Sequence, residues 1–288
     1  MSLFMQRPKQ ENASFFIPKG YNYMQTQSVN PLLGKLKLPG RTFRLPSGGI
    51  MYKNGELSSQ EGEVHVHPMS AMTEINLKNP DLLFNGKALQ QVCAECIPEI
   101  SQPLKLFGRD IDALMIFLRL VTYGPDFQIS VKHNCEHAKD HNYIVNVEDL
   151  VRTMVQLEPT MVDKYQVTLS NGQVVKLQPI RFEQMIKLFQ MNAGKTAQPN
   201  AELDIEDIKK NIVFNMVNLI ESVDDITDKA QIEEWVKAIP TTMQNRIAEV
   251  IEKMNEWGPS NKTTLICKDC KEEFTCELPL NAISFFTE

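Results

Sequence analysis

Two short segments, far apart in the chain, carry the residue types that bind metal ions. One is Cys267-Lys268-Asp269-Cys270, in which two thiols stand three positions apart. Residues of alternating polarity flank it, so we predict a β-hairpin with both cysteines in its turn. Such a turn directs both sulfurs, and nearby backbone amides, toward one point, which is half of a tetrahedral zinc site. The remaining ligands must come from another part of the chain.

The predicted source of those ligands is the segment 133–141. It contains one cysteine and three of the five histidines, and it lies between two alternating runs at 127–131 and 143–147, which again predicts strand, turn and strand. We expect Cys135, His141, Cys267 and Cys270 to hold a structural zinc ion, with His137 as the alternative to His141.

Two other interpretations remain open for these residues. The cysteines could be reduced thiols in a polar turn beside histidines on a solvated loop, or the zinc could be catalytic. The chain has no His-Glu-x-x-His motif and no glutamate where a general base is expected. The sequence therefore favours a structural ion.

Composition limits the class of protein. The chain has 288 residues, 42% of them hydrophobic and 23% charged, which allows one large domain or two modest ones. The formal charge of −6 disfavours a nucleic-acid partner. No apolar run is long enough to cross a bilayer and no leader is visible, so neither a membrane partner nor secretion is expected. The six cysteines do not form a disulfide pattern and suit a reducing compartment.

Periodicity predicts an α+β fold: a core of small mixed sheets and helices, closed by a zinc-ribbon-like pair of knuckles and interrupted by a helical bundle. Helices are expected at 82–97, 110–123 and 180–191, and a hairpin around Asn171-Gly172, where both turn residues would take positive φ. Cys93 and Cys96 lie on the apolar face of the first helix, so we assign them to the core and not to redox chemistry.

Breaks in the pattern predict four parts: an extended arm at 1–44, an α+β core at 45–192, a helical bundle inserted at 193–258, and a hairpin at 259–288 that completes the core. Within the inserted part, the pattern predicts a linker at 193–200 and only helices over 203–258. The arm contains Phe15, Phe16, Tyr21 and Tyr23 but no periodic element. It is either a disordered tail or an arm that becomes ordered on a neighbouring subunit, since free disordered segments are usually poor in aromatic residues.

Several short motifs occur in an order that resembles one known family. They are Leu45-Pro46-Ser47-Gly48-Gly49-Ile50-x-Tyr52, Val64-x-Val66-x-Pro68-Met69, Gly86-Lys87-Ala88-Leu89, Ala113-Leu114, Leu118-Arg119, Tyr123-Gly124-Pro125-x-Phe127, and Cys267-x-x-Cys270-x-x-x-Phe274 followed by Phe285-Phe286. Together they resemble the baseplate proteins of contractile-tailed, T-even-like bacteriophages, over most of 45–150 and the last 25 residues. That family's first knuckle usually has a second cysteine, where this chain has Cys135 followed by His137 and His141.

The resemblance implies a non-catalytic protein that builds or joins the baseplate hub, as a hub component or a hub assembly factor. Its partners would be other baseplate or hub proteins, in a homo-oligomer or a hetero-complex. It would be found in the host cytoplasm during assembly and in the tail baseplate of the virion. The main alternative is a zinc-ribbon regulator that binds nucleic acid or polymerase, and a metalloenzyme is the third possibility.

Overall fold

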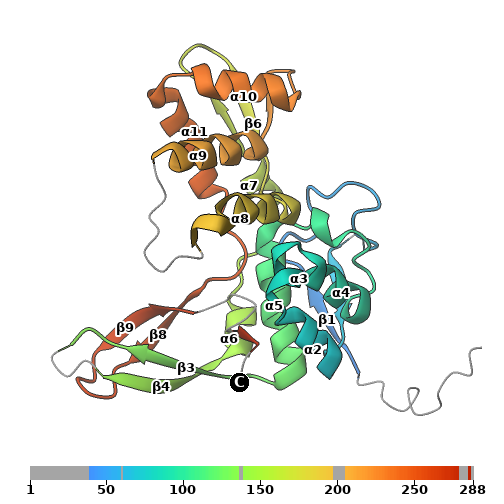
Figure 1. The fold of residues 1–288 in the computed structure, drawn as a ribbon, viewed down its shortest axis with the longest axis vertical. Helices are drawn as coiled ribbons and strands as arrows, with labels where there is room; N and C mark the ends of the chain where they lie inside the picture. The colour runs from blue at the N-terminus through green and yellow to red at the C-terminus, as the bar shows by residue number, and fades with distance from the viewer. Residues whose placement is uncertain (1–38, 60, 136–138, 197–204, 279–284, 287–288) are drawn as a thin grey trace, which may run out of the picture. The chain divides into compact units, whose positions relative to one another are not determined.

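A computed structural model of the chain describes residues 39–288 except 60, 136–138, 197–204, 279–284 and 287–288. The predicted arm and His137 therefore lie mostly or wholly outside the described residues. The described part combines helices with two- and three-stranded antiparallel sheets, so the predicted α+β class is confirmed (Figure 1). No helix in this part of the chain is long and apolar enough to span a membrane.

The first of two hydrophobic cores surrounds the longest helix, α5. Its other elements are the β1–β2 pair, helices α2, α3, α4 and α6, and the β3–β4 hairpin. Their bounds are β1 Arg41–Arg44, β2 Glu63–Val66, α2 Ala71–Leu77, α3 Pro80–Phe84, α4 Lys87–Cys96, η1 Pro103–Lys105, α5 Gly108–Tyr123, β3 Asp126–Lys132, β4 Asp140–Asn146 and α6 Val147–Arg152. β1 shows that the last residues of the predicted arm belong to this core.

The helix predicted over 82–97 is two helices, α3 and α4, separated at Gly86. Gly86 has φ of 73°, in the left-handed region, which glycine adopts without steric cost. The chain therefore bends at this point. Cys93 and Cys96 are buried in the core as predicted, and burial raises their thiol pKa values to about 12 and about 11.

The C-terminal segment closes this core against α5. Phe285 and Phe286 are fully buried, and the Phe285 carbonyl accepts a hydrogen bond of 2.7 Å from Arg119 Nη1. The Arg119 guanidinium also lies over the Phe127 ring, 4.5 Å from its centroid. A buried arginine needs such partners, because an uncompensated charge in an apolar core is costly.

A buried carboxylate fixes the loop 45–52 on the start of α5. Asp110 Oδ1 accepts the backbone N–H of Ser47 at 3.0 Å, and Asp110 Oδ2 accepts the Tyr52 hydroxyl at 2.8 Å. Burial raises the pKa of Asp110, these donors act to lower it, and the net value is about 6. Residues 46–51 form turns, in which Gly48, Gly49 and Met51 all take positive φ.

The second core joins the 157–177 region to residues 216–257. Its elements are α7 Pro159–Val162, β5 Gln166–Thr168, β6 Val174–Leu177, α8 Phe182–Thr196, α9 Ile205–Leu219, β7 Ile220–Val223, α10 Lys229–Ala238 and α11 Thr241–Lys253. The prediction that 203–258 is all helical is wrong at β7, which pairs antiparallel with β6 and satisfies its open edge. The predicted boundary at 193 thus does not separate two cores.

Two further details differ from the sequence analysis. α8 continues to Thr196, so part of the predicted linker is helical. In the β5–β6 turn only Gly172 takes a positive φ, 85°, whereas both Asn171 and Gly172 were expected to do so. The last two strands, β8 Lys262–Ile266 and β9 Glu273–Glu277, form the predicted C-terminal hairpin.

Candidate metal centre

The tips of two hairpins meet around three thiols and one imidazole. Hairpin β3–β4 contributes His133 and Cys135 from its connecting loop, and hairpin β8–β9 contributes Cys267 and Cys270 from its turn. One ligand atom of each residue lies within 4.8 Å of those of the other three. The two hairpins run side by side in Figure 1, although more than a hundred residues separate them in sequence.

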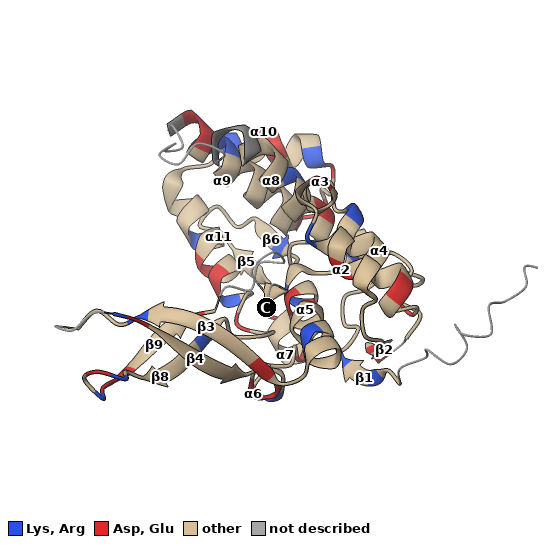
Figure 2. Cartoon of the chain, turned by 60° about the horizontal axis from the view of Figure 1, so that its bottom comes forward, with Lys and Arg blue, Asp and Glu red and all other residues tan. Residues whose placement is uncertain are grey.

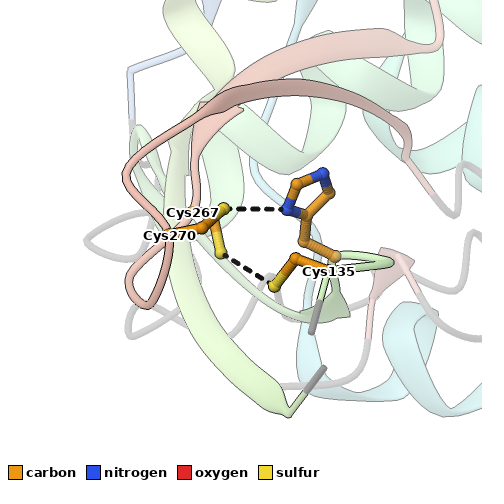
Figure 3. A group of neighbouring side chains, drawn as sticks. Cys135, Cys267 and Cys270 are labelled. Carbon is orange, nitrogen blue, oxygen red and sulfur yellow. Dashed lines mark hydrogen bonds between the residues drawn. The ribbon is translucent and has the colours of Figure 1, made fainter. Parts of the chain in front are cut away.

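Two short distances in the cluster cross between the hairpins. Cys135 Sγ is 4.0 Å from Cys267 Sγ, and Cys270 Sγ is 3.4 Å from His133 Nδ1 (Figure 3). In a tetrahedral site with Zn–S of about 2.3 Å and Zn–N of about 2.0–2.1 Å, sulfurs stand roughly 3.8 Å apart and sulfur and nitrogen roughly 3.6 Å apart. The two distances therefore match the edges of a zinc tetrahedron, and a Cys₃His donor set is one that zinc commonly takes.

The turn between the two C-terminal cysteines is tightly closed. The Cys267 N–H donates to the Glu272 carbonyl at 2.9 Å, and the Lys271 N–H donates to the Cys267 carbonyl at 3.1 Å. Lys271 takes a φ of 65°, which lets the chain reverse. Both sulfurs consequently face the β3–β4 hairpin.

Backbone amides in this turn favour a thiolate at Cys267. The N–H of Cys270 has the largest effect and that of Asp269 adds to it. With further hydrogen bonds from the side chains of His133 and Cys270, they lower the pKa of Cys267 to about 6 against the effect of burial. At Cys270 the N–H of Glu272 lowers the pKa, but desolvation and the neighbouring thiols of Cys267 and Cys135 outweigh it and the net direction is upward. Two crowded thiols cannot both ionise easily without a cation between them.

Aromatic packing holds the imidazole in place. The His133 ring stacks on Phe274 of β9, with centroids 4.6 Å apart and an interplanar angle of 19°. Phe274 in turn meets the Tyr143 ring edge-on at 6.0 Å. Because Phe274 belongs to the second hairpin, this stacking fixes His133 relative to the cysteines that it faces.

Polar contacts join the hairpins on either side of the four residues. His141 Nε2 lies 2.7 Å from Asp269 Oδ2, and the Lys268 N–H donates to the Tyr143 hydroxyl at 3.3 Å. Lys268 Nζ also donates to the Asn142 carbonyl at 2.6 Å. These bonds place the turn 267–270 on β4 independently of any metal.

The structure brings together three of the predicted ligands, Cys135, Cys267 and Cys270. It places His133 in the fourth position, and it places His141 against Asp269 instead; His137 lies outside the described residues. His133 is one of the three histidines of the segment 133–141, but it was not among the predicted ligands. The short spacing His133-x-Cys135, on one loop at the end of one strand, was the signal that could have found it.

A comparison with protein families gives one match. Residues 56–287 match a family model described as T4 bacteriophage base plate protein. Comparison with curated proteins and with solved structures found no match. The matched range contains all four residues of the cluster and most of both cores.

Proposed function

The chain belongs to the family of T4 bacteriophage base plate proteins, and on this premise we propose that it is a non-catalytic part of the baseplate hub whose two hairpins are tied together by a structural zinc ion. Family membership makes the chain a phage baseplate component. The assignment to the hub, as a component or an assembly factor, and the identity of the ion are our proposal.

The observation that carries the zinc proposal is the Cys₃His cluster itself. Four protein ligands fill a tetrahedral shell, which leaves no position for a water molecule or a substrate, as in structural sites. Two of the ligands come from each hairpin, so an ion would cross-link segments that lie more than a hundred residues apart in the sequence. Zinc bound there supplies a rigid link between the hairpins.

Measurement of the metal content tests the zinc proposal. Protein purified without chelator should contain about one equivalent of zinc per chain. A Cys267→Ser, Cys270→Ser double variant should contain little, and full zinc content in that variant would remove the assignment.

The hub proposal is tested in infected cells. Baseplate subassemblies can be separated by sedimentation, and mass spectrometry then shows which fraction contains this chain. We expect it with the central hub proteins and with other tail proteins as its partners. Its absence from hub fractions, with recovery only in peripheral baseplate parts, would contradict the hub assignment while leaving the family assignment intact.

A further inference from the structure

A groove between α9 and α10 is lined by apolar side chains and edged by lysines. Its volume is about 800 Å³, and Met191, Val213, Phe214 and Val217 form its floor. Met191 is 46% exposed, so part of this floor faces solvent. Open apolar grooves of this kind on soluble proteins commonly bind another protein.

The edge of the groove carries one uncompensated positive charge. Lys210 lies 3.9 Å from Glu206, and Lys237 lies 2.5 Å from Glu233, so each of these lysines has an acidic neighbour on its own helix. Lys209, which is exposed, has neither an ion pair nor a hydrogen bond to a side chain in the described part of the chain. The groove is therefore suited to an apolar side chain that has a carboxylate next to it.

The connection between β7 and α10 has that combination. Ile226 is 48% exposed and follows Asp224 and Asp225, with Asp228 two residues further on, all of them exposed. Asp224 Oδ1 accepts the Val174 N–H, and Asp228 caps α10 by accepting the Gln231 N–H. The Asp225 carboxylate makes no hydrogen bond or ion pair with the described residues, so its charge is available to another molecule.

The backbone holds this connection in one conformation. Val223 and Ile226 exchange two hydrogen bonds, from Val223 N–H to the Ile226 carbonyl at 3.0 Å and from Ile226 N–H to the Val223 carbonyl at 2.9 Å. The Ile226 side chain is therefore presented from a rigid turn, and little conformational entropy would be lost when it binds.

We propose that the turn bearing Asp225 and Ile226 of one copy docks into the α9–α10 groove of a second copy, with Ile226 on the apolar floor and Asp225 beside Lys209. The turn and the groove are different surfaces of one chain. Two copies can therefore form both contacts at once as a two-fold dimer, or repeat a single contact head to tail as a ring or a filament, according to the rotation between neighbours. The inference goes beyond the baseplate assignment and does not depend on the zinc.

The test is a charge exchange followed by analytical ultracentrifugation of the full chain. The wild type should self-associate with rising concentration, and added salt should weaken the association. Lys209→Glu and Asp225→Lys should each weaken it about tenfold or more, because each places like charges together. Lys187→Glu and Glu61→Lys, which change exposed residues outside both surfaces, are the matched controls and should behave as the wild type.

The decisive sample is the equimolar mixture of Lys209→Glu and Asp225→Lys proteins. Between unlike chains the introduced lysine faces the introduced glutamate and the native Asp225 faces the native Lys209, so the mixture should associate where neither variant does so alone. Ile226→Ser, at an exposed position, should also weaken association of the otherwise unchanged chain. A wild type that stays monomeric, variants that associate like the controls, or a mixture no stronger than its components would each overturn the proposal.

Discussion

His133 Nδ1 lies 3.4 Å from Cys270 Sγ, although 137 positions separate the two residues in the sequence. This contact joins the loop of the first hairpin to the turn of the second. Together with the Cys135–Cys267 pair it places four metal-binding groups at one point. Figure 2 shows Lys and Arg interspersed with Asp and Glu over the helices and strands.

The first prediction separates the two histidines. His133→Gln should lower zinc affinity by at least about tenfold, because it removes a ligand, whereas His141→Gln should retain about one equivalent. Competition with a chromophoric chelator measures both affinities. A larger loss of zinc affinity in His141→Gln than in His133→Gln would show that His141, and not His133, is the fourth ligand.

The second prediction concerns removal of the metal. A zinc link between Cys135 and Cys267 closes a loop of 132 residues, and a covalent cross-link over such a loop is worth on the order of 4–5 kcal/mol. Metal bonding adds to that value. Chelation should therefore increase hydrogen exchange in residues 126–146 and 262–277 while α10 and α11 remain protected, since their core is formed without the cluster.

Hydrogen exchange can contradict this prediction in two ways. Equal loss of protection in both cores would mean that the chain unfolds as one unit. No loss anywhere would mean that the polar contacts, such as His141–Asp269, hold the hairpins without an ion.

The third prediction concerns pH. The pKa of Asp110 is raised by burial from 3.8 to about 6, so between these values the folded protein binds more protons at this residue than the unfolded protein does. The contribution of Asp110 to the free energy of unfolding therefore decreases as pH rises from about 4 to about 6, and it does not decrease further above pH 6. A shift of this size corresponds to roughly 3 kcal/mol at most.

Urea unfolding of wild type and Asp110→Asn at several pH values measures the effect. The stability of the wild type relative to the variant should increase as pH falls from 7 to 5. Any effect of pH on the metal site is common to both proteins and cancels in the difference. A difference that is independent of pH would show that Asp110 does not titrate in this range.

The fourth prediction concerns the C-terminal aromatic pair. Phe285→Ala should destabilise the fold by about 3–5 kcal/mol, because the side chain is fully buried and its loss leaves a cavity against Arg119. Phe189→Ala is the control, since Phe189 is 56% exposed, and it should cost far less. Equal effects in urea unfolding would contradict the packing described for the end of the chain.

Local patterns predicted much of the first core and three of the four cluster residues. The strands flanking the first loop and the long helix α5 follow from alternation and from a helical stripe that ends at Gly124. Cys267 and Cys270 follow from their own spacing, and Cys135 is the one cysteine in the matching hairpin loop. These features depend on neighbouring residues and so are visible in sequence.

The position of His133 in the cluster and the formation of β7 depend on contacts that the sequence does not show. Strand register pairs His141 with Val131, which places His141 beside Asp269, while His133 lies just beyond β3 and turns toward Phe274. β7 directly continues α9, and only pairing with β6 makes it a strand. A tertiary contact overrides the local pattern in both cases.

X-ray absorption at the zinc edge of the purified protein tests the central claim most directly, because it counts the sulfur and nitrogen neighbours of the ion. We predict three sulfurs at about 2.3 Å and one imidazole nitrogen at about 2.0–2.1 Å, with the nitrogen lost in His133→Gln and kept in His141→Gln. A spectrum with two sulfurs or an oxygen-rich shell, or a protein that contains no zinc, would contradict the account.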